Sequence, residues 1–410
     1  MGKAKTPNSK QMPIIAERPL SERHFDPLLL IATMTLVGLG IVMVYSASFV
    51  LASQRFGDSY YFLKKQALYA GGGIALMLLT AQVDYHRWRK LAIPLLVVGM
   101  GLLAILILPG MRQEVGGSVR WLKFSILSFH ISFQPAELAK FALVLYMAYS
   151  LTKKEGKMKS FTVGFLPHFL VLGVLFGLVL KQPDFGTGIV FGFLVFLMLF
   201  VGGTRLLFLG GTVLAALPGL IYIATRADYR LKRWFAYLNP WDDPEGAGFQ
   251  IIQSFLAFGA GKLFGVGLGD GRQKLFYLPE PHTDFILSVI GEELGLVGVV
   301  SVIGLFAILI LRGFRVCFRA PDLFGTYLAL GITALIAVQS ILNMGVVMGL
   351  LPTKGSTLPF ISYGGTSLVV NLLAVGVLLN ISSRVVGWSN ENHDRRRGDG
   401  RASLPGPGPG

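Results

Sequence analysis

Ten long runs of apolar residues divide this chain, and they restrict its fold more than any other feature of the sequence. A helix needs about 20 residues to cross the hydrocarbon core of a bilayer, and several runs reach that length only with their polar flanks. The chain is therefore predicted to be an all-α integral membrane protein with ten transmembrane helices. The runs are roughly Leu28–Leu51, Gln66–Ala81, Leu91–Leu108, Ala136–Leu151, Phe165–Leu180, Gly186–Val201, Leu206–Ala224, Asp284–Leu311, Leu323–Leu350 and Gly365–Val386.

The composition supports a membrane protein. Of the 410 residues, 53% are hydrophobic and 14% are charged, whereas soluble domains carry about 25% charged residues. A net charge of +15 would suggest nucleic-acid binding in a soluble protein, but here the basic residues are dispersed over short loops, where topology and anionic lipid account for them. Cys317 is the only cysteine, so no disulfide forms within the chain.

The distribution of Lys and Arg predicts which loops face the cytoplasm. With a cytoplasmic N-terminus, the short inward segments carry many more basic residues than the short outward loops, as the positive-inside rule requires. Ten spans then place both termini in the cytoplasm. Residues 1–26 form an N-terminal tail without a cleavable signal, residues 27–388 form the ten-helix domain with a long outward loop at 225–283, and residues 389–410 form a tail predicted to be disordered.

A carboxylate stands at the start of the eighth apolar run, at Asp284. A charge at the edge of a lipid-embedded helix is costly, so it usually has a function. The alternative is that Asp284 is the N-cap of the helix, and the two roles are compatible. Glu292 and Glu293 lie about two turns deeper, and we interpret them as structural, with one of them paired inside the bundle.

The other unusual polar motifs also fall on predicted outward loops, which indicates that the working surface faces out of the cell. Glu137 and Lys140 share a helix face because they are three residues apart. They are predicted either to form an ion pair that fixes helix packing or to contact substrate or Asp284. Lys181 and Asp184 are predicted to be either functional or a solvated turn.

Further candidates lie in the long outward loop. His282 is interpreted as a hydrogen-bonding neighbour rather than a metal ligand, because the other histidines show no ligand spacing. The glycine-rich segment 265–271 is not preceded by a strand, so we interpret it as a tight loop whose backbone approaches a ligand or a neighbour, and not as a dinucleotide site. The basic residues of the loop are either solvated at the membrane surface or able to bind anionic headgroups or a diphosphate; they are Arg226, Arg230, Lys232, Arg233, Lys262, Arg272 and Lys274.

Four strings in this order resemble those of the SEDS family (shape, elongation, division and sporulation). They are FQPAELAK at 133–140, QPDFGT at 182–187, HTDFI at 282–286 and LPFISYGG at 358–365. The resemblance extends from about Phe25 to Trp388. The string GEELG at 291–295 and the long N-terminal tail favour the cell-division branch of the family over the rod-elongation branch, which stays the alternative.

The resemblance implies a peptidoglycan glycosyltransferase that polymerises lipid II at the outer face of the cytoplasmic membrane, at the division septum. It implies as partners a class B penicillin-binding transpeptidase and other divisome membrane proteins. The essential aspartate of the family falls on Asp284, and its fourth-span acid and lysine fall on Glu137 and Lys140. We expect substrate-binding or supporting roles for these last two and for Arg120, Lys181, Asp184, His282, Thr283, Lys354 and Ser362.

Asp284 could remove the proton of a sugar hydroxyl as it attacks an anomeric carbon, because partial desolvation makes a carboxylate more basic. A single base suffices, since diphosphate leaves readily once Lys, Arg or a divalent cation neutralises its charge. Binding Mg²⁺ is the alternative role for Asp284. A lipid II flippase is the alternative function, but a carrier's polar site should lie near the membrane midplane, whereas these motifs lie toward one face.

Overall fold

The structure is a computed structural model that describes residues 25–385 except 109–112, 116–117, 127–128, 226–227 and 276. The two predicted tails lie outside these residues, apart from Phe25 and Asp26. The described chain is mostly helical, as predicted. Its α-helices are α1 (Pro27–Phe56), α2 (Tyr61–Gln82), α3 (Trp88–Ile105), α4 (Pro135–Lys153), α5 (Leu166–Leu180), α6 (Phe185–Val201), α7 (Leu206–Thr225), α8 (Asp228–Leu238), α9 (Phe249–Gly261), α10 (Ile286–Arg319), α11 (Leu323–Val347) and α12 (Gly365–Ser382).

Each of the ten predicted apolar runs corresponds to one of these helices. Among the described residues, six helices are long and apolar enough to cross a membrane by length and composition, namely α1, α10, α11, α12 and two helices extended by short turns at their N-termini, Tyr85–Ile105 and Phe161–Leu180. Shorter apolar helices occur at Phe185–Val201, Leu206–Gly219 and Phe249–Gly261. The chain is therefore a multi-pass membrane protein.

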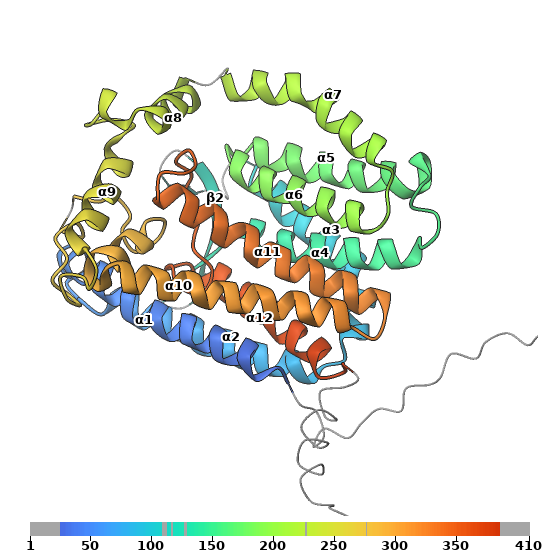
Figure 1. The fold of residues 1–410 in the computed structure, drawn as a ribbon, viewed down its shortest axis with the longest axis horizontal. Helices are drawn as coiled ribbons and strands as arrows, with labels where there is room; N and C mark the ends of the chain where they lie inside the picture. The colour runs from blue at the N-terminus through green and yellow to red at the C-terminus, as the bar shows by residue number, and fades with distance from the viewer. Residues whose placement is uncertain are drawn as a thin grey trace, which may run out of the picture.

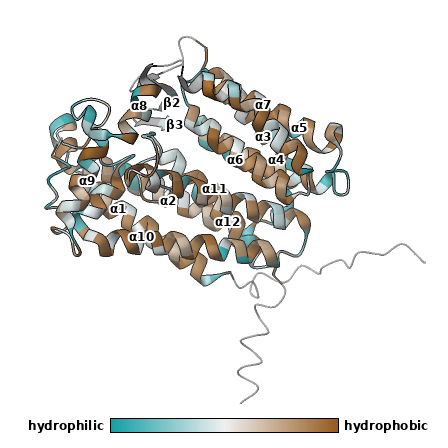
Figure 2. Ribbon diagram, turned by 45° about the horizontal axis from the view of Figure 1, so that its top comes forward, coloured by the Kyte–Doolittle hydropathy of each residue, from teal (hydrophilic) through white to brown (hydrophobic). Residues whose placement is uncertain are grey.

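The helices form a bundle around α10, α11 and α12 (Figure 1). Helix α12 packs on α2, while α11 lies between α10 and α4, and α1 covers α10. Helix α7 runs along the edge of the bundle, where Leu207 and Leu214 are 79% and 72% exposed. Figure 2 shows apolar residues along the helix lengths and hydrophilic residues mainly at their ends, as expected for helices in lipid.

Residues 113–133 contradict the all-α prediction, because they form an antiparallel sheet of three strands. These are β1 (Gln113–Val115), β2 (Ser118–Ile126) and β3 (Phe129–Phe133), in the order β1-β2-β3. The strands are rich in aromatic and β-branched residues, which favour a sheet. Leu122 of β2 is buried against Leu106, just after the end of α3, so the sheet is attached to the bundle.

The long segment 225–283 is also more structured than a loop. It contains α8 and α9, and α9 is joined to the bundle by Ser254. The Ser254 hydroxyl donates to the Val347 carbonyl at 2.6 Å and lies 2.7 Å from the Ser288 hydroxyl. One short polar residue thereby ties α9 to both α10 and α11.

Helix α10 is broken at Gly295, which has φ 66°. The break leaves backbone groups without helical partners on both sides, and the glycine-rich loop satisfies them. Val266 and Gly267 donate to the carbonyls of Glu292 and Glu293, while the amide nitrogens of Leu296 and Val297 donate to carbonyls at 262 and 263. A Cβ at Gly265 or Gly295 would overlap the opposing backbone, so only glycine fits at this approach. The neighbour that the 265–271 loop approaches is therefore α10 itself.

Glu292 and Glu293 are both structural in this fold. Glu293 is buried, pairs with Lys274 at 2.6 Å and accepts from the Ser46 hydroxyl of α1. Glu292 accepts from the backbone nitrogens of Arg272, at 2.7 Å, and Gln273. The two carboxylates hold residues 272–274 against α10, and the pairing with Glu293 removes Lys274 from the set of basic residues that could bind a ligand.

Candidate active site

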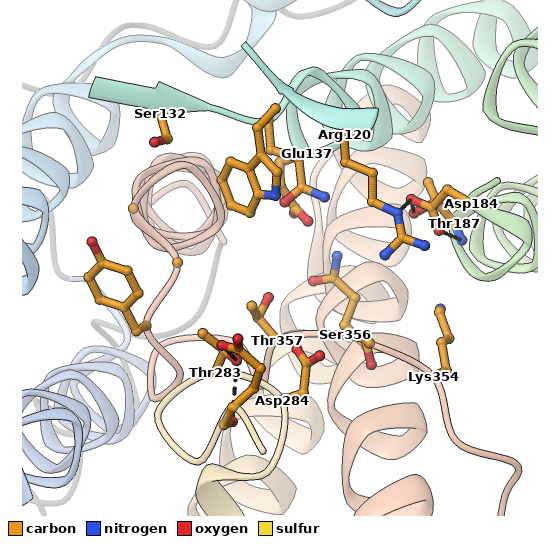
Figure 3. Close-up of a pocket in the computed structure, with 18 of the residues that line it drawn as sticks. Arg120, Ser132, Glu137, Asp184, Thr187, Thr283, Asp284, Lys354, Ser356 and Thr357 are labelled. Carbon is orange, nitrogen blue, oxygen red and sulfur yellow. Dashed lines mark hydrogen bonds and ion pairs between the residues drawn. The ribbon is translucent and has the colours of Figure 1, made fainter. Parts of the chain in front are cut away.

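A cavity of about 610 Å³ opens where several helix ends meet (Figure 3). It is formed by the N-terminal turns of α2, α4, α6 and α12, by α8 and the C-terminal part of α11, by β2 and β3, and by the loops that precede α10 and α12. Segments from all four predicted outward motifs meet here. Of the predicted residues, it is lined by Arg120, Glu137, Lys140, Asp184, His282, Thr283, Asp284 and Lys354.

Asp284 lies just outside α10. The helix begins at Ile286, close to the predicted start of the apolar run. It has Phe285 at its N-cap with no side-chain cap, so the interpretation of Asp284 as the N-cap is wrong. No described residue donates a hydrogen bond to its carboxylate. Burial raises the pKa of Asp284 to about 6, with a further increase from Glu280 and opposing effects from Arg120 and other cations. Asp284 is therefore a carboxylate that can both accept and release a proton near neutral pH.

The backbone around Asp284 is fastened by three consecutive hydrogen bonds. The amide nitrogen of Tyr363 donates to the carbonyl of His282 at 2.9 Å, and the Ser362 hydroxyl donates to the carbonyl of Thr283 at 2.5 Å. The side-chain amide of Asn343 donates to the carbonyl of Asp284 at 2.9 Å. Ser362 is buried and does not line the cavity, so it supports the site through the backbone.

Arg120 of β2 crosses to the start of α6. Its Nε lies 3.6 Å from Asp184 Oδ2, and its Nη2 donates to the Pro183 carbonyl at 3.2 Å. Asp184 also accepts from the backbone nitrogen and hydroxyl of Thr187, which makes it the N-cap of α6. Figure 3 shows these side chains together on one side of the cavity, with Lys354 nearby. Asp184 thus orients Arg120, whereas Lys181 is exposed and does not line the cavity.

Lys354 reaches the cavity from the loop between α11 and α12. Its side chain lies directly against Gly186, where a Cβ would overlap it. Burial lowers the pKa of Lys354 to about 8, with Asp184 opposing this shift and Lys140 and Arg120 adding to it. In the described part of the chain, no group bonds to its ammonium. A cation held in this way is available to an anionic ligand.

Glu137 and Lys140 form the predicted ion pair, with Lys140 Nζ 2.8 Å from Glu137 Oε1. Both side chains are buried and both line the cavity, so the packing role and proximity to a ligand coincide. Removing either partner would leave an unpaired buried charge.

His282 contributes an aromatic contact instead of the expected side-chain hydrogen bond. Its ring centroid lies 4.6 Å from that of Phe62 and 5.7 Å from that of Tyr363. Within the described residues its Nδ1 has no partner. Burial lowers the pKa of His282 to about 4, so the ring is neutral at pH 7. The neighbouring Thr283 hydroxyl donates toward Glu280.

Several cavity residues were not predicted as site residues. Tyr69, Gln134, Gln339, Ser356 and Thr357 line the cavity, as does Arg233, which was named only as one of several basic residues. The signal that could have found Gln339 is a primary amide inside an otherwise apolar run. Tyr69 and Gln134 carry no such signal, because polar and aromatic residues are common at helix ends in membranes.

The described residues contain no group of three His, Cys, Asp or Glu side chains that could hold a metal ion. Asp284 and Glu280 both line the cavity, but they supply too few ligands for a cage built by protein alone. The donor set therefore does not fit a resident divalent ion.

Comparisons with known proteins agree along nearly the whole chain. A protein of Geobacter metallireducens named "Probable peptidoglycan glycosyltransferase FtsW" is 50% identical over 364 residues, which cover 89% of this chain and 96% of the relative. Stage V sporulation protein E of Bacillus subtilis is 46% identical over 357 residues, covering 87% of this chain and 96% of that protein.

Solved structures show the same fold. One is described as "Structural coordination of polymerization and crosslinking by a peptidoglycan synthase complex". Its matching chain has a TM-score of 0.71 at 31% identity, and the match covers 88% of this chain and 99% of that chain. The rod shape determining protein RodA of Thermus thermophilus has a TM-score of 0.64 at 29% identity, covering 88% and 98%. The family model of the cell cycle proteins FtsW, RodA and SpoVE matches residues 27–386. With this match and these relatives, the chain belongs to the FtsW/RodA/SpoVE family of cell cycle proteins, as its motifs predict.

Proposed function

We propose that this protein is a peptidoglycan glycosyltransferase that polymerises lipid II during cell division, with Asp284 as the general base. The observation that carries the proposal is a carboxylate of raised pKa, unpaired among the described residues, in a cavity that also presents cationic side chains. The higher identity to relatives named FtsW than to RodA supports the cell-division role over the elongation role.

In the proposed reaction, Asp284 accepts the proton of the acceptor sugar hydroxyl. The hydroxyl oxygen forms a bond to the anomeric carbon of the donor, and the bond from that carbon to the diphosphate oxygen breaks. Attack from the face opposite the leaving group inverts an α-diphosphate to a β-glycosidic link. A carboxylate of pKa near 6 suits this step, because it is ionised at pH 7 yet basic enough to take a proton in the transition state.

The leaving diphosphate is assigned to the side of the cavity that holds Lys354 and Arg120. Lys354 supplies an ammonium to which no described residue bonds, and Arg120 presents a guanidinium already oriented by Asp184. Fixed cations at the position where charge develops lower the barrier without reorganisation. The charge of Lys140 is neutralised by Glu137, so we assign this pair a structural role in the lining of the cavity.

The alternative role of Asp284 is to bind a divalent cation brought by the diphosphate. Mg²⁺ often binds through one carboxylate and substrate phosphates, so this role needs no protein cage. The two roles differ when a diphosphate is present. With inorganic diphosphate added, the base role predicts the same Mn²⁺ binding to wild type and Asp284→Asn, whereas tighter binding that Asp284→Asn abolishes would favour the metal role.

We further propose ten membrane crossings, cytoplasmic termini and a cavity at the outer face, as the distribution of Lys and Arg indicates. The cavity is lined from one end of the helices, which favours an enzyme over a flippase with a site open to both faces. A class B penicillin-binding transpeptidase is the proposed partner, because a solved structure of this fold belongs to a synthase complex of polymerization and crosslinking. Other divisome proteins and the septum are proposed from family membership.

The test is polymerisation of lipid II by purified protein together with its partner transpeptidase. Wild type is expected to form glycan chains, and Asp284→Asn to lose roughly 100-fold or more of the rate, the usual contribution of a general base. A wild type that moves lipid II across liposomes but forms no polymer would overturn the proposal in favour of a flippase. An Asp284→Asn variant with full activity would overturn the role of that carboxylate alone.

A further inference from the structure

Gln339 is a buried amide that faces the cavity and has no partner among the described residues. It lies on α11, lines the cavity and is 7% exposed. Its Oε1 has no hydrogen bond among the described residues, and none of them bonds to its Nε2. A buried polar group of this kind is costly to leave unpaired, so its presence at a ligand cavity points to a partner that arrives with the ligand.

Several polar groups near Gln339 already have partners within the protein. Glu137 and Lys140 bond to each other, and the Thr187 hydroxyl donates to Asp184. Asn343, one turn further along α11, donates to the carbonyls of Asp284 and Ser356. The Oδ1 of Asn343 has no hydrogen bond among the described residues, but Asn343 does not line the cavity, and none of these groups bonds to Gln339.

The surroundings of Gln339 also indicate what kind of group it binds. Leu342 lies on the same face of α11, three residues further on, and Val190 of α6 lines the cavity as well. The site therefore combines a primary amide, which both donates and accepts, with apolar side chains. An acetamido group matches both parts, because its N–H and C=O pair with an amide and its methyl group packs against Leu and Val. A phosphate would instead require cations, and a hydroxyl would leave the apolar contacts unused.

We propose that Gln339 recognises an acetamido group of the substrate sugars. The inference rests on the proposed function, since the two sugars of a lipid II unit carry such groups. Gln339 would then be a specificity residue. It lies on α11, the helix whose Asn343 positions Asp284. Gln339 would bind the acetamido group about one helical turn of α11 away from Asn343, which holds Asp284.

The experiment compares polymerisation of lipid II with that of two synthetic analogues, in each of which one sugar has a hydroxyl in place of its acetamido group. Wild type is expected to prefer lipid II over at least one analogue by roughly 10- to 100-fold, because the analogue leaves the buried amide unpaired. Gln339→Leu is expected to lose most of that preference, mainly by losing rate with lipid II.

The control is Gln66→Leu, which removes another buried glutamine with an unpaired Oε1, on α2 and outside the cavity lining. It is expected to change the rates with all three substrates by the same factor. If Gln339→Leu does not survive purification, Gln339→Met is measured in the same way. Wild-type preference retained by a folded Gln339 variant would overturn the inference while leaving the proposed function intact. A wild type that polymerises none of the three substrates would overturn the proposed function itself.

Discussion

The side-chain amide of Asn343 holds the backbone of Asp284, at 2.9 Å from its carbonyl oxygen. The same nitrogen also reaches the carbonyl of Ser356. One side chain of α11 thus fixes the loop before α10 and the loop before α12 against each other. The position of the Asp284 carboxylate depends on this bond, although Asn343 itself does not line the cavity.

We expect Asn343→Leu to lower activity by roughly 10- to 100-fold and to reduce thermal stability, because it leaves two partly buried carbonyls without this donor, at a cost of up to about 1–3 kcal/mol each. Polymerisation rate and melting temperature in detergent are the measurements. Ser340→Ala is the matched control, since among the described residues the Ser340 hydroxyl bonds only within α11. Equal effects of the two variants would contradict the assigned role of Asn343.

Gly355→Ala should inactivate the protein without unfolding it. A Cβ at this position would lie 2.8 Å from Asp284 Oδ2, so the carboxylate must shift. A misplacement of this size in an active site can cost about 100-fold in rate. The control is Gly101→Ala, where a Cβ meets nothing within 4 Å. A Gly355→Ala variant with wild-type activity would show that the carboxylate can move without loss.

The pH dependence of kcat/KM should be bell-shaped. Asp284 accepts a proton only when ionised, so activity rises as pH passes its pKa of about 6. Lys354 binds a diphosphate as a cation only when protonated, so activity falls as pH passes its pKa of about 8. Lys354→Arg should move the alkaline limb to higher pH, because arginine stays charged there. An unchanged alkaline limb in that variant would assign it to another group.

The buried pair of Lys274 and Glu293 should show strong coupling. Removing one partner strands the other charge, so Glu293→Gln or Lys274→Met is expected to destabilise by about 3–5 kcal/mol. The double variant should be less destabilised than the sum of the single changes. Unfolding in denaturant measures all four proteins of the cycle, and additive effects would argue against a coupled pair.

The helical part of the fold could be predicted because lipid imposes a simple pattern of long apolar runs. The sheet at 113–133 escaped prediction because its strands are short and lie between two stronger helix signals. The break at Gly295 also escaped, since one glycine in an apolar run is tolerated in a helix and only the opposing 262–267 backbone reveals the need for it.

The residues of the candidate site also include some that the sequence could predict and some that it could not. The charges at Asp284, Arg120 and Lys354 could be predicted to meet, because each is costly near lipid and all lie on loops assigned to one side. The residues that support the site could not be predicted. Asn343, for example, looks like any polar residue in a membrane helix, and it acts through a carbonyl 59 residues away in the chain. Lys181, although next to the same motif, proved to be exposed.

The break at Gly295 divides α10 into two parts with different surroundings. Residues 286–293 are buried, and the last two of them bond to the glycine-rich loop, while the stretch beyond exposes Leu296, Val297 and Val300. A lipid-crossing segment adjusts its tilt when the bilayer thickens or thins. Because the helix is not continuous at Gly295, we expect such tilting to be taken up at the break, and the position of Asp284 to be insulated from the hydrophobic mismatch that each membrane composition imposes.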